Sequence, residues 1–408
     1  LSLLRFAGIL PVGYNLPDVL AALANFTVTA ALILFCGLRR IRWGLLAGAA
    51  WYAAALVPSA FWLSALPAGF LACLLAASLL LFVAAVLCRY ASSVSPGEGG
   101  FWATLAFLMP VVLLVIAVAL GWWAVRRKWI VLLMPLVALV LNLGYISAMV
   151  QLPDFKERGN PHDIRIATLN VNGFRRLEST PATARAIAGM VNREQVDVLC
   201  LQEFMDSREF PADSIGKVFA RRMPYFLHEG GAALASRYPV LDHKYVRFAD
   251  TNNDYLRADL LVGDDTVRLF SVHLQTSGIA QLRRRFRKDY NRDAPVERIL
   301  GELEHNSSIR AGQVGEIRVE IDASPYPVIL AGDFNDTPSS YTYHTMKGNM
   351  TDGFRDSGSG YGGTFRYLGG VLRIDYIFYD DAFEGIRYYM PPEDVSDHKA
   401  VVAELRFR

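Results

Sequence analysis

The sequence predicts two structural classes in one chain, an α-helical membrane region followed by a domain of alternating strands and helices. The 408 residues are 53% hydrophobic with a mean hydropathy of +0.25, which is high for a soluble protein. Long apolar runs fill the first 150 residues, and short β-branched runs alternate with amphipathic stretches after residue 163. Charge divides in the same way. Residues 1–153 hold eight Lys/Arg and two Asp/Glu (net +6), whereas residues 154–408 hold 33 and 37 (net −4) and all seven histidines.

Four apolar runs have about the 20 residues needed to cross a bilayer, and they are residues 17–37, 67–88, 101–124 and 129–150. A fifth run, 44–63, is weaker and is interrupted by Pro58. The runs have no polar face, which argues against a soluble helical bundle. They contain no Asp, Glu or His except Asp18 at one edge, which argues against an ion pathway. We therefore expect residues 1–150 to be a membrane anchor of four to five apolar segments.

Two basic clusters bear on orientation, Arg39 to Arg42 and Arg126 to Lys128. Both should be cytoplasmic, because positive charge is enriched in cytoplasmic loops. This requires four spans with residues 44–63 re-entrant or interfacial, whereas five spans would place the clusters on opposite sides. The four-span arrangement puts residues 154–408 outside the cytoplasm.

Residues 151–163 gain Pro, Gly and charge, so we interpret them as a linker to a second domain at 164–408. Hydrophobic patterning predicts strands and helices in alternation through this domain. The expected strands are 164–171, 196–203, 232–236, 256–262, 266–274, 328–331, 373–379 and 399–407. The expected helices are 183–193, 279–293, 296–322 and 339–347.

Polar side chains of one chemical kind follow or end five of these strands. They are Asn170 with Asn172, Glu203, His273, Asp333 with Asn335, and Asp375, and a sixth set, Ser396-Asp397-His398, precedes the last strand. Each set alone has a plain structural explanation as a solvated strand end, a core histidine or a turn. Their recurrence in one domain favours a functional site built on a sheet scaffold. Carboxylate and amide oxygens suit a hard cation and a phosphate group.

The motifs and their order resemble the endonuclease/exonuclease/phosphatase superfamily over residues 162–408. The matching stretches are Asn170-Val171-Asn172-Gly173, Gln202-Glu203, His273-Leu274, Gly332-Asp333-Phe334-Asn335, Asp375 and Ser396-Asp397-His398. Within the superfamily the chain more closely resembles membrane-anchored bacterial members of the Bacteroidetes type, which also carry N-terminal transmembrane helices and a stretch like Ser340-Tyr341-Thr342-Tyr343.

The resemblance implies an α+β fold of the DNase I-like type, a four-layer α/β/β/α sandwich preceded here by an N-terminal transmembrane helical region. For a bacterial chain we expect the inner (plasma) membrane, and the four-span orientation given by the basic clusters then places the catalytic domain in the periplasm.

The resemblance further implies metal-assisted hydrolysis of a phosphate ester, with Mg²⁺ or Mn²⁺ as cofactor. The implied metal ligands are Glu203, Asp397, and Asn172 or Asn170. Asn172 stands where some members have Asp, so the resemblance leaves open whether the site holds one metal ion or two.

The implied catalytic residues have different roles. Asp333 would orient or deprotonate the attacking water, and Asn335 would hold a phosphoryl oxygen. His398, oriented by Asp375, would act as a base or bind the phosphate, and His273 would face the leaving group. We also expect Arg257 to contact a phosphate, although an ordinary surface-strand arginine explains it equally well.

We therefore predict a membrane-anchored, metal-dependent phosphodiesterase, most closely nuclease-like. The alternatives are a phospholipid or sphingolipid phosphodiesterase, a phosphatase, or an inactive membrane-tethered binding module. The expected partners are a nucleic acid or phospholipid headgroup as substrate, and the bilayer, with no protein partner. The basic run from Arg283 to Lys288 would suit a polyanion or anionic headgroups, but a solvated helix face explains it as well.

Overall fold

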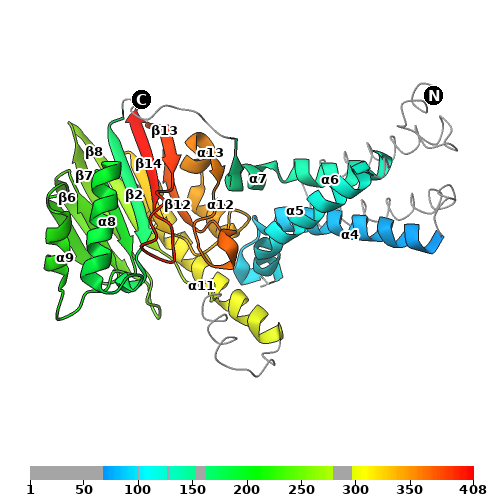
Figure 1. Ribbon diagram of the computed structural model, residues 1–408, viewed down its shortest axis with the longest axis horizontal. Coiled ribbons are helices and arrows are strands. Elements are labelled where there is room, and N and C mark those ends of the chain that lie inside the picture. The colour runs from blue at the N-terminus through cyan, green and yellow to red at the C-terminus, as the bar shows by residue number, and fades with distance from the viewer. Residues whose placement is uncertain (1–67, 99–100, 126–128, 153–161, 279–295) are drawn as a thin grey trace. The chain divides into compact units, whose positions relative to one another are not determined.

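The computed structural model describes residues 68–98, 101–125, 129–152, 162–278 and 296–408 (Figure 1). The predicted apolar runs 17–37 and 44–63, the predicted helix 279–293 and the basic run within it lie outside these residues. By its internal contacts the chain divides into two compact units. One holds the described residues up to Arg89 with Leu108–Leu143, and the other holds Tyr90–Phe107 with Gly144–Arg408.

The described part of the apolar half forms helices at the three predicted runs that it contains. They are α4 (Ala68–Ala91), α5 (Phe101–Val125), α6 (Trp129–Leu141) and α7 (Leu143–Met149), with a short 3₁₀ turn, η1 (Pro96–Glu98), between α4 and α5. Within the described ranges, α5 is long and apolar enough to cross a membrane, and α6 with α7 would make a second span if counted together. The finding rests on length and composition.

The run predicted at 129–150 is not one straight helix, because α6 and α7 meet at an angle of 64°. Asn142 lies at the break and is fully buried. Its side-chain amide donates to the carbonyl oxygens of Ala138 at 2.9 Å and Ala85 at 3.4 Å. A side-chain donor that bonds a carbonyl of the preceding turn competes with the helical backbone, and such insertions cause kinks.

The second unit contains two mixed six-stranded sheets (Figure 1). The first has the order β10-β12-β9-β8-β7-β6, formed by Thr351–Asp352, Asp375–Tyr379, Val328–Asp333, Asp265–His273, Asp254–Val262 and Val240–Arg247. The second has the order β13-β14-β2-β3-β5-β4, formed by Phe383–Tyr389, Val401–Phe407, Ile164–Asn170, Val198–Gln202, Ala232–Ser236 and Tyr225–Glu229. A two-stranded ribbon pairs β1 (Val150–Gln151) with β11 (Gly360–Tyr361).

Among the described residues, three large cores of buried side chains define four layers. One core lies between the two sheets and includes Ile166, Leu256 and Ile329. The second joins the β2 sheet to α8 (Thr180–Glu194) and α9 (Ala212–Phe219). The third joins the other sheet to α11 (Val296–Asp322) and α12 (Tyr341–Lys347). Short helices η2 (Asn172–Phe174), α13 (Gly353–Ser357) and η3 (Leu368–Gly370) complete the unit. The predicted four-layer α/β/β/α arrangement is confirmed.

Candidate functional site

The strand registers explain why the predicted site residues meet. β2 runs parallel to β3 with Asn170 opposite Gln202, so Glu203 follows at the same edge. In the other sheet, β8 runs parallel to β9 with His273 opposite Asp333. β12 is antiparallel to β9, and its first residue, Asp375, also lies opposite Asp333. Polar residues of both sheets thus gather at one end of the sandwich.

Gly332 permits the close pairing that places Asp333 beside His273. Its φ is +146°, and a Cβ atom there would lie 2.0 Å from the carbonyl oxygen of Val272. Only glycine tolerates this approach, because any side chain would collide with backbone atoms that cannot move away.

Asn170 connects the two sheets through its side-chain amide. The Nδ2 atom donates to Glu203 Oε1 at 3.0 Å and to Asp333 Oδ2 at 2.9 Å. Its Oδ1 accepts from the backbone N–H of Asn172 at 3.0 Å. Asn170 is almost fully buried, so its hydrogen bonds fix the two carboxylates relative to one another.

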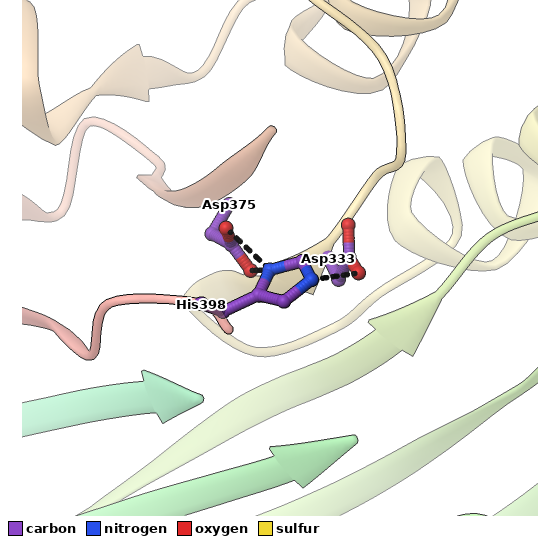
Figure 2. Close-up of side chains that lie close together, drawn as sticks. All are labelled: Asp333, Asp375 and His398. Atoms are coloured by element: carbon purple, nitrogen blue, oxygen red, sulfur yellow. Dashed lines mark hydrogen bonds and ion pairs between the residues drawn. The ribbon is translucent and has the colours of Figure 1, made fainter. Parts of the chain in front are cut away.

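His398 lies between two buried carboxylates, as Figure 2 shows. Its Nδ1 is 3.0 and 3.1 Å from the two carboxylate oxygens of Asp375, and its Nε2 is 3.7 Å from Asp333 Oδ2. Burial acts to lower the pKa of His398, but the negative charges of Asp375 and Asp333 outweigh it and raise the pKa to about 10. Burial also raises the pKa of Asp333, to about 6.

His273 is the last residue of β8 and lies near the carboxylates of Glu203 and Asp333. Its Nε2 lies 3.7 Å from Glu203 Oε1 and 4.0 Å from Asp333 Oδ2, both too long for hydrogen bonds. Among the described residues, this buried nitrogen has no hydrogen-bond partner. A buried polar atom without a partner calls for an explanation, and a water or a ligand atom can supply the missing contact.

The remaining predicted residues are attached to this cluster through short loops. The Oγ of Ser396 donates to Asn170 O at 2.6 Å and contacts Asp397 Oδ1 at 3.2 Å, which places Asp397 next to β2. The backbone N–H of Asn335 donates to Asp333 Oδ1 at 2.8 Å, and its side-chain amide donates to Leu274 O at 2.9 Å.

Three of these residues have left-handed backbone conformations, Asn172 (φ 46°), Glu203 (φ 50°) and Asn335 (φ 53°). Non-glycine residues there cost about 1 to 3 kcal/mol each and persist where the surrounding structure over-determines them. For Glu203 the surrounding bonds run from Gly173 N to its carbonyl oxygen and from Asn170 to its carboxylate.

The structure does not bring Arg257 into the cluster. This residue lies on β7, and its guanidinium pairs with Asp242 on the neighbouring strand β6. The plain alternative considered for it, a strand arginine with a structural partner, describes this arrangement.

The sequence analysis did not identify several residues that contact the site residues or the loops that carry them. Thr364 Oγ1 accepts from the backbone N–H groups of Ile374 and Asp375, each at 3.1 Å, and the Phe365 ring lies 4.9 Å from the His398 ring. Arg310 of α11 donates to Asp336 Oδ2 at 3.2 Å and to Gln275 O at 2.9 Å. The two glycines that precede Thr364 signal a special loop, but a lone arginine in a helical pattern gives no signal.

The residues fit a divalent cation, and two donor sets are possible. By spacing alone, Asp333, Asp375 and His398 qualify, since one ligand atom of each lies within 4.8 Å of the others. Both nitrogens of His398 face carboxylates, however, so a protonated ring that donates to them is the better description. Glu203, Asp397 and Asn170 instead supply oxygen atoms alone, which is the ligand type that Mg²⁺ prefers, and the Glu203 side chain is 40% exposed.

Comparison with known proteins identifies the family of this chain. A family model described as the endonuclease/exonuclease/phosphatase family matches residues 167–398, more than half of the chain. The chain belongs to the endonuclease/exonuclease/phosphatase family. Members of this family are hydrolases that act on phosphoester bonds and generally use divalent metals. A second family model, described as a domain of unknown function, matches residues 70–149. A comparison with curated proteins finds no match.

Several solved structures resemble this chain at low identity. A family protein from Beutenbergia cavernae is 20% identical, with a TM-score of 0.46 over 60% of this chain and 72% of that one. A family protein from Leptotrichia buccalis is 16% identical (TM-score 0.44, 60% and 100% covered). Sphingomyelinase C from Streptomyces griseocarneus is 20% identical (TM-score 0.44, 60% and 99% covered).

Proposed function

We propose that the chain is a membrane-anchored, divalent-metal-dependent hydrolase of phosphodiester bonds. The observation that supports this most directly is the side-chain amide of Asn170, which joins Glu203 of one sheet to Asp333 of the other. Because Asp333 is also next to His398, one end of the sandwich combines a cation-binding carboxylate, a carboxylate for the attacking water and a cationic imidazolium.

The roles follow from position. Glu203, with Asp397 and Asn170 or Asn172, would hold Mg²⁺ or Mn²⁺, which supplies Lewis-acid stabilisation of negative charge on the phosphoryl oxygens. Asp333 orients the attacking water and accepts its proton. His398, held in orientation by Asp375 at 3.0 Å, binds the phosphate as imidazolium. Asn335 directs an amide hydrogen to a phosphoryl oxygen, and His273 donates to the leaving oxygen from its otherwise unpaired Nε2.

Membrane anchoring is part of the proposal. In the most apolar window of α5, mean hydropathy is 2.8 and 22% of the residues are buried, whereas a core helix of a soluble protein would be mostly buried. The basic cluster Arg126 to Lys128 follows α5 directly in the sequence. We therefore assign the C-terminal end of α5 to the cytoplasm, because positive charge is enriched in cytoplasmic loops. The Phe101 end of α5 then lies outside the cytoplasm, together with the compact unit that contains the site (Tyr90–Phe107 with Gly144–Arg408, here called the hydrolase unit). In a bacterial cell this side of the membrane is the periplasm.

The test uses the full chain purified in detergent micelles with bis(p-nitrophenyl) phosphate as a soluble diester. Hydrolysis should require Mg²⁺ or Mn²⁺, stop with EDTA, and fall about 10²-fold to 10⁴-fold in Asp333→Asn. The matched control is Asp265→Asn, at the opposite end of β8, which should keep full activity. Turnover that survives EDTA, or equal turnover in both variants, would contradict the proposed function.

A further inference from the structure

Two pieces of the apolar half belong to the same compact unit as the hydrolase site, Tyr90–Phe107 and Gly144–Met149. The first includes the opening turns of α5. Ser339 Oγ donates to Ala106 O at 2.5 Å, and Phe107 packs against a small core of Phe365, Leu372 and Ile374. The site domain is thus in direct contact with the beginning of the helix that is long and apolar enough to cross a membrane.

The second piece is the end of α7, which is attached to the same face. Arg373 donates to Ala148 O at 2.9 Å, and Gly362 N donates to Met149 O at 2.8 Å. The next residues form β1, with Val150 opposite Tyr361. The loop between residues 358 and 373 is therefore held against a second apolar helix end.

Both contacts between the apolar helices and the site domain involve residues that lie next to the proposed catalytic residues. Ser339 is four residues after Asn335 on the same loop. Phe365, which packs with Phe107, has its ring 4.9 Å from that of His398, and its neighbour Thr364 accepts from the backbone N–H of Asp375.

Helix geometry gives the depth in a membrane at which Ser339 contacts Ala106 of α5. Ala106 is five residues beyond Phe101, which is about 7 Å along a helix. The headgroup zone on each side of a bilayer is about 5 to 7 Å thick. Tyr90 and Trp102, with ring centroids 5.0 Å apart, are the residue types that anchor at this zone. With the start of α5 at the membrane surface, the loop that carries Asn335 lies at headgroup level.

The rim of the site on the Glu203 side includes an exposed apolar side chain. Met205 is two residues from Glu203, is 51% exposed, and its sulfur lies 3.6 Å from Nη2 of Arg175. An apolar side chain next to a guanidinium matches the boundary between acyl chains and anionic headgroups. A nucleic acid, by contrast, would have to bring a hydrated polyanion to the bilayer surface to reach this site.

We infer that the substrate is a phospholipid of the membrane that carries the chain, with its phosphodiester at headgroup level. The inference rests on the proposed function. One water adds its oxygen to phosphorus, one P–O ester bond breaks, and the departing alkoxide takes a proton. The products are one alcohol and one phosphomonoester.

The test reconstitutes the full chain in vesicles of phosphatidylethanolamine, phosphatidylglycerol, cardiolipin and sphingomyelin in equal parts with Mg²⁺. Bis(p-nitrophenyl) phosphate and plasmid DNA are offered in the surrounding buffer. Loss of each lipid, release of p-nitrophenol and nicking of plasmid are measured in the same samples, with Asp333→Asn as the inactive control. We expect at least one host lipid to be hydrolysed at least tenfold faster than either soluble substrate. Labelled lipid in added enzyme-free vesicles should remain intact.

A pair of variants tests the orientation of the site. Met205→Gln makes the rim polar, and the ratio of lipid to soluble-diester hydrolysis should fall roughly tenfold. Leu241→Gln is the matched control, since Leu241 is 55% exposed near the start of β6. The site end of the sheet is the other end of β6, where Arg247 pairs with Asp254 and Asp254 with His273, and six residues of strand, about 20 Å, separate Leu241 from it. The ratio should not change in this control.

Two results would contradict the inference about the phospholipid substrate without contradicting the proposed hydrolase function. EDTA-sensitive and Asp333-dependent cleavage of the soluble diester or of plasmid, with all host lipids intact, would overturn the lipid inference and leave the hydrolase proposal standing. Equal hydrolysis of host lipid and of lipid in enzyme-free vesicles would overturn the headgroup-level placement. No turnover of any substrate by folded protein would overturn both proposals.

Discussion

Replacing Arg373 should destabilise the hydrolase unit far more than an ordinary surface ion pair does. Arg373 and Asp352 are both fully buried and bind through two parallel contacts, Nη1 to Oδ2 at 2.8 Å and Nη2 to Oδ1 at 2.6 Å. Tyr343 also donates to Asp352 at 2.6 Å. Burial alone would raise the pKa of Asp352, but Arg373 outweighs it and holds that pKa below its usual range. The pair therefore stays ionised across neutral pH.

The magnitude follows from the burial. Removing one partner of a buried pair leaves the other charge without compensation, which costs about 3 to 5 kcal/mol. For a domain of this size, 1 kcal/mol corresponds to a shift of about 2 to 4 °C in Tm, so Arg373→Met should lower Tm by about 6 to 20 °C. Methionine keeps much of the side-chain volume, so the loss reports charge and hydrogen bonding more than a cavity.

The assay is thermal unfolding of the full chain in detergent, followed by tyrosine near-ultraviolet circular dichroism. The control is Arg406→Met, because Arg406 pairs with Glu384 at 2.7 Å while both side chains are more than 40% exposed. Exposed pairs contribute about 0 to 1 kcal/mol. If both variants lower Tm by the same few degrees, the reasoning from burial is wrong.

Three further predictions concern the site. The His398 imidazole, followed by nuclear magnetic resonance, should stay protonated through neutral pH and titrate near its pKa of about 10. Asp375→Asn removes a neighbouring negative charge and should lower this pKa by about 1 to 3 units. Asp397→Asn should lower it by less. Because His398 binds its proton more tightly in the folded state, it should stabilise the fold fully below pH 6.5, and this stabilisation should be lost as pH rises toward 10. This loss appears as a fall in Tm between pH 7 and 10 that is smaller in His398→Gln. Thr364→Val removes the acceptor for the buried backbone N–H groups of Ile374 and Asp375 and should cost about 1 to 3 kcal/mol, whereas Thr251→Val, on a partly exposed turn, should cost less in the same melts.

The sequence predicts the buried strands because their pattern is continuous. The expected strands 232–236 and 266–274 coincide within a residue with β5 and β8, which are almost wholly buried. Neither β6 nor β4 is predicted, since both are edge strands. Along β6 the exposed residues Asp242, His243 and Lys244 hide any alternation. Charged residues on an edge discourage pairing with other chains, and they also remove the hydrophobic signal that identifies a strand.

The site was predictable to the extent that its residues are placed by strand ends. Asn170, His273, Asp333 and Asp375 terminate or begin strands, so their convergence follows from sheet topology. The sequence could not show that Asn170 would bond both Glu203 and Asp333, because that contact depends on how the two sheets face each other. Arg257 lies in the middle of a strand, and a strand interior provides no reason for its side chain to turn toward the site.

The attachment of α7 has a consequence for recombinant expression. The carbonyl of Ala148 accepts a hydrogen bond from the fully buried Arg373, and Val150 and Gln151 pair with β11. A shortened chain that starts at residue 162 would lack all three, which would leave a guanidinium N–H without its acceptor and β11 without its partner. Unpaired strand edges template association between molecules. A soluble version of the hydrolase unit should therefore begin at or before Gly144, where the chain enters that unit for the second time, within α7, if it is to resist aggregation.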